Sequence, residues 1–124
     1  MKSIILITTM LLTFGAANAQ IGEVKVAGNQ LNIYDVNGIR MAGSISFYTS
    51  DELVGYNAEY IVVKQGNQAV IYNAKGVSNN RYVPLCDGCK VKNVTPSAIL
   101  VKDGNGMTRY YDFEGNNTGK YTTD

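Results

Sequence analysis

The sequence of 124 residues contains no histidine. Histidine is the most frequent general base at neutral pH and a frequent zinc ligand, so its absence excludes Ser-His-Asp and Cys-His catalysis within this chain. A catalytic site would have to depend on carboxylates alone. Asp51 and Glu52 are adjacent, so on a strand they would point to opposite faces, and Asp112 and Glu114, two residues apart, are typical of a solvated strand edge. We therefore expect no enzyme, no catalytic residue and no cofactor.

An excess of charge and long apolar runs are also lacking. Eleven basic and ten acidic residues are mixed along the chain, which argues against a nucleic-acid partner. The apolar run at residues 4–14 is shorter than the ~20 residues of a membrane-spanning helix. Lys2 before it and Ala17-Asn18-Ala19 after it match a signal peptide. We predict a signal peptide at residues 1–19, one domain at residues 20–124, no membrane span, and a secreted or periplasmic location.

Cysteine is scarce, with Cys86 and Cys89 the only two. In an exported chain this pair predicts a disulfide, which would close a hairpin tip because Asp87-Gly88 between them favours a turn. A zinc site would need two further ligands without histidine. The segment from Asp103 to Gly106 has the outline of a calcium loop, but it lies between strands, and its Asp, Asn and Gly are the residues that tight turns select. We expect no metal site.

The pattern of residues 20–124 predicts an all-β fold. Short runs of Val, Ile, Tyr and Thr alternate with Gly, Asn and Asp, and no long helical periodicity is present. The run Ile61-Val62-Val63 predicts a strand buried on both faces. Pro84 predicts an edge strand, and residues 120–124 are expected to be a polar tail. Strands are expected at residues 23–27, 31–36, 39–41, 44–49, 53–56, 60–65, 68–73, 82–85, 90–94, 98–102 and 107–113.

One stretch of the sequence occurs more than once. It reads Gly28-Asn29-Gln30-Leu31-Asn32-Ile33-Tyr34-Asp35-Val36-Asn37-Gly38 and returns 38 residues later as Gly66-Asn67-Gln68-Ala69-Val70-Ile71-Tyr72-Asn73-Ala74-Lys75-Gly76. An imperfect third copy begins at Gly104-Asn105 and ends one residue late, at Gly115. A constant period of this size is typical of repeat architectures. The sequence therefore predicts about three imperfect 38-residue repeats of short antiparallel strands.

Four short strands in a period near 40 residues resemble a β-propeller blade of the WD40 type. In this resemblance Tyr34-Asp35 and Tyr111-Asp112 match the aromatic-Asp pair that ends a blade strand, while Tyr72-Asn73 departs from it and the Gly-His element is absent. The chain is too short for the ~4–8 blades of a closed propeller. The resemblance therefore implies a homo-oligomer in which two chains meet head to tail.

A second resemblance gives an alternative fold. Leu31-Asn32-Ile33-Tyr34-Asp35-Val36-Asn37-Gly38, followed by Tyr60-Ile61-Val62-Val63-Lys64, is similar to the sorting domains of the type IX secretion system of Bacteroidetes-like bacteria. Those domains carry an IYDxNG hairpin and a YIVK strand at the C-terminus of a chain, whereas about sixty residues follow the second element here. This resemblance implies an immunoglobulin-like β-sandwich and a bacterial source.

Tyrosine is the most suggestive residue type, with nine copies and no tryptophan. Tyr34, Tyr72 and Tyr111 hold the same place in the repeat, and their flat amphipathic rings are candidate binding surfaces for sugars or peptides. The alternative is that each ring covers the core beneath it. We expect an exported, non-catalytic binding protein whose ligand is a surface glycan or a partner protein. The alternative function is a structural or assembly subunit that self-associates through sheet edges.

Overall fold

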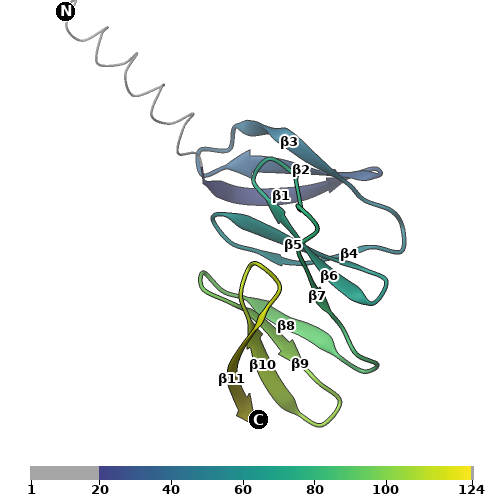
Figure 1. The fold of residues 1–124 in the computed structure, drawn as a ribbon. Helices are drawn as coiled ribbons and strands as arrows, with labels where there is room; N and C mark the ends of the chain where they lie inside the picture. Colours follow the sequence, from purple (N-terminus) through teal and green to yellow (C-terminus); the bar gives the residue numbers. More distant parts are fainter. Residues whose placement is uncertain (1–19, 124) are drawn as a thin grey trace, which may run out of the picture.

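A computed structural model of the chain describes residues 20–123, so the predicted signal peptide lies outside the described residues. This part of the chain forms eleven strands in three antiparallel sheets and contains no helix, which confirms the all-β prediction. The sheets stack in chain order (Figure 1). The first sheet has the order β1 (Ile21–Ala27), β2 (Gln30–Asp35), β3 (Arg40–Ser46). The second is β4 (Glu52–Tyr56), β5 (Tyr60–Gln65), β6 (Gln68–Asn73), β7 (Tyr82–Pro84), and the third is β8 (Lys90–Val94), β9 (Ile99–Lys102), β10 (Met107–Tyr111), β11 (Asn117–Thr123).

Two-residue turns set the register of the first two sheets. Gly28 and Gly66 each have a φ of 63°, while the asparagine that follows each of them stays at negative φ. Positive φ at the first position alone defines a type II′ turn, whose twist matches that of an antiparallel hairpin. The carbonyl oxygens of Asn29 and Asn67 then accept hydrogen bonds from the Phe47 and Leu85 amides, at 2.8 and 2.7 Å. The same hydrogen bond thus recurs at the 38-residue offset.

A second type of turn ends β2, β6, β9 and β10. Its first residue is Asp or Asn, and the side-chain Oδ1 accepts hydrogen bonds from the backbone amides two and four residues further on. The sequence had presented Tyr72-Asn73 as a departure from the aromatic-Asp pair. Because an amide oxygen accepts these bonds as well as a carboxylate oxygen does, Asn73 fills the same role as Asp35. The first residues of these turns are Asp35, Asn73, Asp103 and Asp112.

The core consists of two apolar layers, one on each side of the second sheet. Ile61 and Val63 point toward the first sheet, whereas Val62 points toward the third, and all three are fully buried. The prediction that this strand is buried on both faces is confirmed. The layer between the first and second sheets also contains Ile21, Val24, Leu31, Ile33 and Ile45. The layer between the second and third sheets also contains Ala69, Ile71, Val83, Leu85, Ile99 and Val101.

Glycines allow the turns of one sheet to approach the backbone of the preceding sheet. Gly76, after β6, lies so close to β3 that a Cβ added to it would stand 2.5 Å from the Ser44 carbonyl oxygen. Gly115, after β10, meets the Tyr82 carbonyl oxygen of β7 in the same way. Gly38, after β2, has the same kind of turn but no atom within 4 Å of such a Cβ. This turn therefore approaches a preceding sheet at Gly76 and Gly115, but not at Gly38 or at Gly106, its counterpart after β9.

The two outer faces of the stack are more polar than the layers between the sheets. Cross-strand partners share a face, so the register places Glu23, Lys25, Asn32 and Tyr34 on the outer face of the first sheet. The corresponding outer face of the third sheet carries Leu100, Lys102, Thr108, Tyr110 and Thr122. Polar outer faces are how stacked architectures end without further association.

Two strand predictions are wrong. Residues 120–124 were expected to be a polar tail, but β11 runs to Thr123 and pairs with β10. Every residue of β11 is exposed, so no apolar alternation marks it in the sequence. The separate strands expected at residues 39–41 and 44–49 are the single strand β3. Pro84 does lie on an edge strand, as predicted. The propeller-blade resemblance and the sandwich alternative stay predictions.

Candidate functional site

Tyr34, Tyr72 and Tyr111 occupy the same place on their sheets but different surroundings. They pair across their sheets with Glu23, Ile61 and Ile99, respectively. Tyr72 packs against the layer between the first two sheets, and its hydroxyl lies 3.1 Å from Gln65 Nε2, which donates to it. Tyr111 packs against the layer between the second and third sheets. Tyr72 and Tyr111 therefore pack against the two apolar layers, and of the three rings only Tyr34 lies on an outer face of the stack.

The outer face of the first sheet combines this ring with hydrogen-bonding side chains. Lys25 Nζ lies 5.2 Å from the centroid of the Tyr34 ring and 3.9 Å from Glu23 Oε1. Gln30 Nε2 donates to Asn32 Oδ1 at 2.7 Å. We call this surface the Tyr34 face and define it by six residues, Glu23, Lys25, Gln30, Asn32, Tyr34 and Ser44.

The outer face of the third sheet repeats the pairing of tyrosine and lysine. Lys120 Nζ lies 4.7 Å from the centroid of the Tyr110 ring. Tyr111 was predicted from the sequence as a binding residue, whereas Tyr110 was not. The alternation of strand residues was the available signal, since Tyr111 pairs with buried Ile99 whereas Tyr110 pairs with Leu100 on the opposite face.

Thr108 is a second unusual residue of the third sheet. It is buried although it lies on the outer face, because Lys102 and Thr122 flank it on the neighbouring strands. Its hydroxyl oxygen has no hydrogen-bond partner among the described residues. A buried hydroxyl without a partner destabilises the folded state. Thr108 stands where the first sheet has Leu31 and the second has Ala69.

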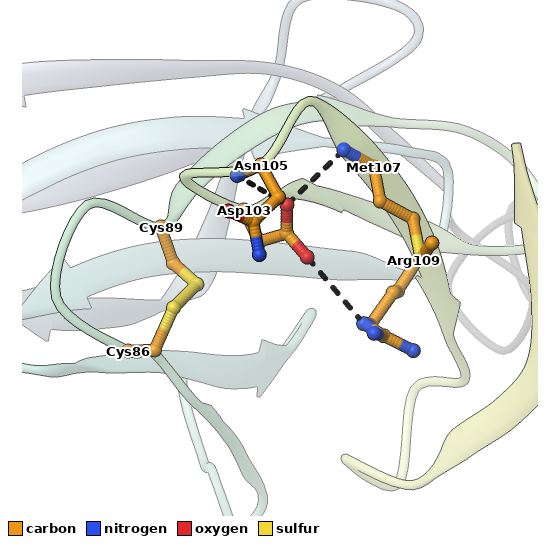
Figure 2. Close-up of polar contacts among 6 residues, drawn as sticks. All are labelled: Cys86, Cys89, Asp103, Asn105, Met107 and Arg109. Carbon is orange, nitrogen blue, oxygen red and sulfur yellow. Dashed lines mark hydrogen bonds and ion pairs between the residues drawn. A yellow bond between two sulfur atoms is a disulfide. The ribbon is translucent and has the colours of Figure 1, made fainter. Parts of the chain in front are cut away.

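The predicted disulfide is present at the tip between β7 and β8. Cys86 and Cys89 are bonded, with their Cα atoms 5.1 Å apart, and the Cys89 amide donates to the Cys86 carbonyl oxygen at 3.0 Å. Figure 2 shows this tip beside the turn that follows β9. Gly88 and Gly104 face one another there, since a Cβ added to Gly88 would lie 3.8 Å from the Gly104 Cα. The short disulfide loop therefore lies against the turn between β9 and β10.

Asp103 is the most strongly held carboxylate of this corner. Its Oδ1 accepts hydrogen bonds from the Met107 and Asn105 amides at 3.1 and 2.8 Å, and its Oδ2 lies 3.8 Å from Arg109 Nε (Figure 2). The two backbone amides, assisted by the Arg109 charge, lower the pKa of Asp103 below its ordinary value. Both carboxylate oxygens of Asp103 are therefore engaged in contacts within the third sheet. Residues 20–123 contain no cluster of three or more His, Cys, Asp or Glu side chains placed to hold a metal ion.

Three of the four carboxylates considered for catalysis have structural partners. Asp51 Oδ2 accepts from the Tyr48 amide at 3.0 Å, and Asp112 Oδ1 accepts from two amides of its own turn. Glu114 Oε1 lies 3.7 Å from Arg81 Nη2. No two of these side chains are brought together as a pair by these contacts. That the protein is not an enzyme stays a prediction.

No helix long and apolar enough to cross a membrane occurs between residues 20 and 123. Comparison of the chain with known protein families, with curated proteins and with solved structures yields no match.

Proposed function

We propose that this protein is an exported, non-catalytic binding protein whose ligand, a surface glycan or a partner protein, contacts the Tyr34 face. The single observation that carries the proposal is the position of Tyr34. Tyr72 and Tyr111 are used in packing between sheets, whereas Tyr34 lies on a face that no other sheet of residues 20–123 covers. The disulfide between Cys86 and Cys89 supports a secreted or periplasmic location, where such bonds persist.

The chemistry of the Tyr34 face favours a glycan. Tyr34, which is half-buried, offers the open part of its ring to the C–H face of a sugar and a hydroxyl for hydrogen bonding. The neighbouring Asn32 amide and Ser44 hydroxyl lie on the same face, because Asn32 pairs with Ser44 across β2 and β3. The Lys25 ammonium on its long stem adds a donor that can follow the ligand. A sheet surface of this kind suits an extended, hydroxyl-rich ligand.

A glycan array probed with the exported protein tests this proposal. We expect binding to a defined glycan class, and loss of that binding in Tyr34→Ala, because the variant removes the stacking surface. Tyr110→Ala is the matched control, since Tyr110 also lies beneath a lysine but on the opposite end of the stack. Glycan binding that survives in Tyr34→Ala and is lost in Tyr110→Ala would refute the assignment to the Tyr34 face.

The second candidate function, a structural subunit that self-associates through sheet edges, is favoured by one observation. Among residues 20–123, β3 and β11 each have a strand neighbour on only one side, whereas β2 and β10 have neighbours on both sides. An edge of this kind is open to pairing with another chain. Sedimentation of the exported protein over a range of concentrations distinguishes the two candidates, because only a self-associating subunit gains mass in the absence of any ligand.

A further inference from the structure

Within residues 20–123, the first sheet lacks a strand that both other sheets possess. In the second sheet, residues 52–56 pair with residues 61–64 of β5, and in the third sheet β8 pairs with β9 in the same position. At the 38-residue offset, residues 61–64 correspond to residues 23–26 of β1, which have no such neighbour among the described residues. The same offset places the counterpart of β4 at residues 14–18, within the predicted signal peptide and outside the described part of the chain.

Two apolar side chains near this position, Tyr56 and Val26, are exposed. In the lower part of the stack, Val94 of β8 lies against Gly55 of β4, so these two flanking strands are stacked on one another. Tyr56 is the counterpart of Val94, because it pairs with Ile61 as Val94 pairs with Ile99. Tyr56 points toward the first sheet but remains 36% exposed, and Val26 at the edge of β1 is 55% exposed. The space between β4 and the edge of β1 is therefore open and partly apolar.

We propose that the free edge of β1, over residues 23–26, binds an extended peptide segment of another protein as an added antiparallel strand. The backbone groups of the edge would supply the hydrogen bonds, as they do in strand addition generally. Tyr56 and Leu53 of β4 form the floor of the site, because both point toward the first sheet. The site shares Glu23 and Lys25 with the Tyr34 face, but its ligand binds the backbone edge of β1 and contacts Tyr56, so the inference goes beyond the proposed function.

A second copy of this chain does not fit the same edge. Two antiparallel edge strands related by a twofold axis keep their sheets facing the same way, so the second sheets of both copies would lie on the same side. β4 already lies next to the open position, on the side of the second sheet. The β5 strand of the other copy would need the place that β4 holds. A single extended segment brings no second sheet and avoids this clash.

The register specifies the chemistry of the bound segment. The residue opposite Val24 corresponds to Gly55, which lies opposite Val62 in the second sheet. This residue would face Tyr56, so it must be small. On the outer face, Glu23 favours a basic partner and Lys25 favours an acidic one, since cross-strand pairs of opposite charge stabilise a sheet. These two positions correspond to Tyr56 and Leu53 in the pairing of β4 with β5.

The test uses a synthetic peptide that copies residues 51–57 with Leu53→Glu and Tyr56→Lys, added to the exported protein whose N-terminus has been read by mass spectrometry. We expect saturable binding and slower amide hydrogen exchange at residues 23–26. A peptide with the two charges interchanged is expected to bind roughly tenfold more weakly. A peptide N-methylated on alternate backbone nitrogens along its β1-facing edge should not bind, because it cannot donate to the edge.

Variants of the protein complete the test. Tyr56→Ala removes the floor of the site and is expected to weaken binding several-fold, whereas Tyr121→Ala, an exposed tyrosine of β11, should leave it unchanged. Unchanged exchange at residues 23–26 in the presence of the peptide would overturn the proposal. So would retention of residues 14–18 with slowly exchanging amides, since the position would then be filled within the chain. A dimer that protects the same residues without peptide would identify a second copy as the occupant.

Discussion

The inner and outer faces of the stack have the same backbone arrangement, but only the inner faces are buried. Ile71 of β6 and Tyr110 of β10 hold corresponding positions, since they pair across their sheets with Val62 and Leu100. Ile71 is buried against the third sheet, whereas Tyr110 lies on a face where the stack ends. The positions of Ala69 and Val83 in the second sheet are likewise held by Thr108 and Thr122 in the third. The same backbone positions therefore carry Ile, Ala or Val where another sheet covers them and Tyr or Thr where the stack ends.

The largest expected difference is between Ile71→Ala and Tyr110→Ala. Removing the buried Ile71 side chain leaves a cavity between two sheets and should lower the free energy of unfolding by about 2–5 kcal/mol. Tyr110→Ala changes an outer face and should cost less than about 1 kcal/mol. Urea denaturation followed by circular dichroism measures both. Equal losses would mean that the outer face of the third sheet is covered in solution.

The next difference concerns two glycines with the same turn. Gly38 and Gly76 have φ values of 81° and 79°, but only Gly76 lies against a preceding strand. Gly38→Ala should lower the free energy of unfolding by about 1–2 kcal/mol, the cost of the left-handed conformation. Gly76→Ala adds a clash with the Ser44 carbonyl oxygen and should cost at least ~1 kcal/mol more.

Thermal denaturation of the two glycine variants side by side gives this difference without knowledge of the unfolded state, because both substitutions change it alike. If the two variants were equally stable, the approach of the Gly76 turn to β3 would not contribute to the joint between the sheets.

A smaller effect is expected from Asp103, which ties the turn of the third sheet. Its pKa is lowered in the folded state, so the carboxylate stabilises the fold above its ordinary pKa. This contribution should be lost as the pH falls below about 4, the range in which unfolded Asp takes up its proton. Asp103→Asn keeps the acceptor oxygen but has no charge to titrate, so its stability should fall less steeply below that pH.

Acid-induced unfolding of the Asp103→Asn variant is best compared with that of Asp87→Asn, which removes one carboxylate from the neighbouring disulfide loop. Parallel acid profiles for Asp103→Asn and the unmodified protein would show that the hydrogen bonds to Asp103 do not favour its ionised form.

The smallest effect is expected for Thr108→Val on the outer face of the third sheet. The variant removes a buried hydroxyl without a partner and keeps the shape of the side chain, so stability should be unchanged or rise by up to about 1 kcal/mol. Thr122→Val, its exposed cross-strand neighbour, is the control and should have no effect. A clear loss of stability in Thr108→Val, measured by urea denaturation, would show that the hydroxyl does have a partner in solution.

Most strands were predictable because they alternate and are bounded by turn residues. The predicted bounds of β5, β6 and β8 agree with the structure, since Gly, Asn and Asp flank these runs. β11 was missed because hydrogen bonds to β10 are enough to form an edge strand, and these leave no apolar pattern in the sequence. The disulfide between Cys86 and Cys89 was predicted correctly, because a turn between two nearby cysteines brings them within bonding distance.

The candidate site was only partly predictable. Tyr34, Tyr72 and Tyr111 were chosen together because the sequence places them at the same point of a repeated string. The structure separates them, since burial depends on whether another sheet lies in front of each ring. The surroundings of Tyr110 and the open edge of β1 were not predicted, because both depend on the number of sheets and strands beside them.

The sequence by itself determined the local conformation of this protein. Glycine, asparagine and aspartate define the turns through positive φ and side-chain hydrogen bonds, and these short-range effects need no distant partner. Only the tertiary structure decided which faces are covered. Glu23 and Ile61 hold corresponding places in β1 and β5, yet one lies on an open face and the other is fully buried. The order of the stack makes that difference, because a face is buried only where a neighbouring sheet excludes water from it.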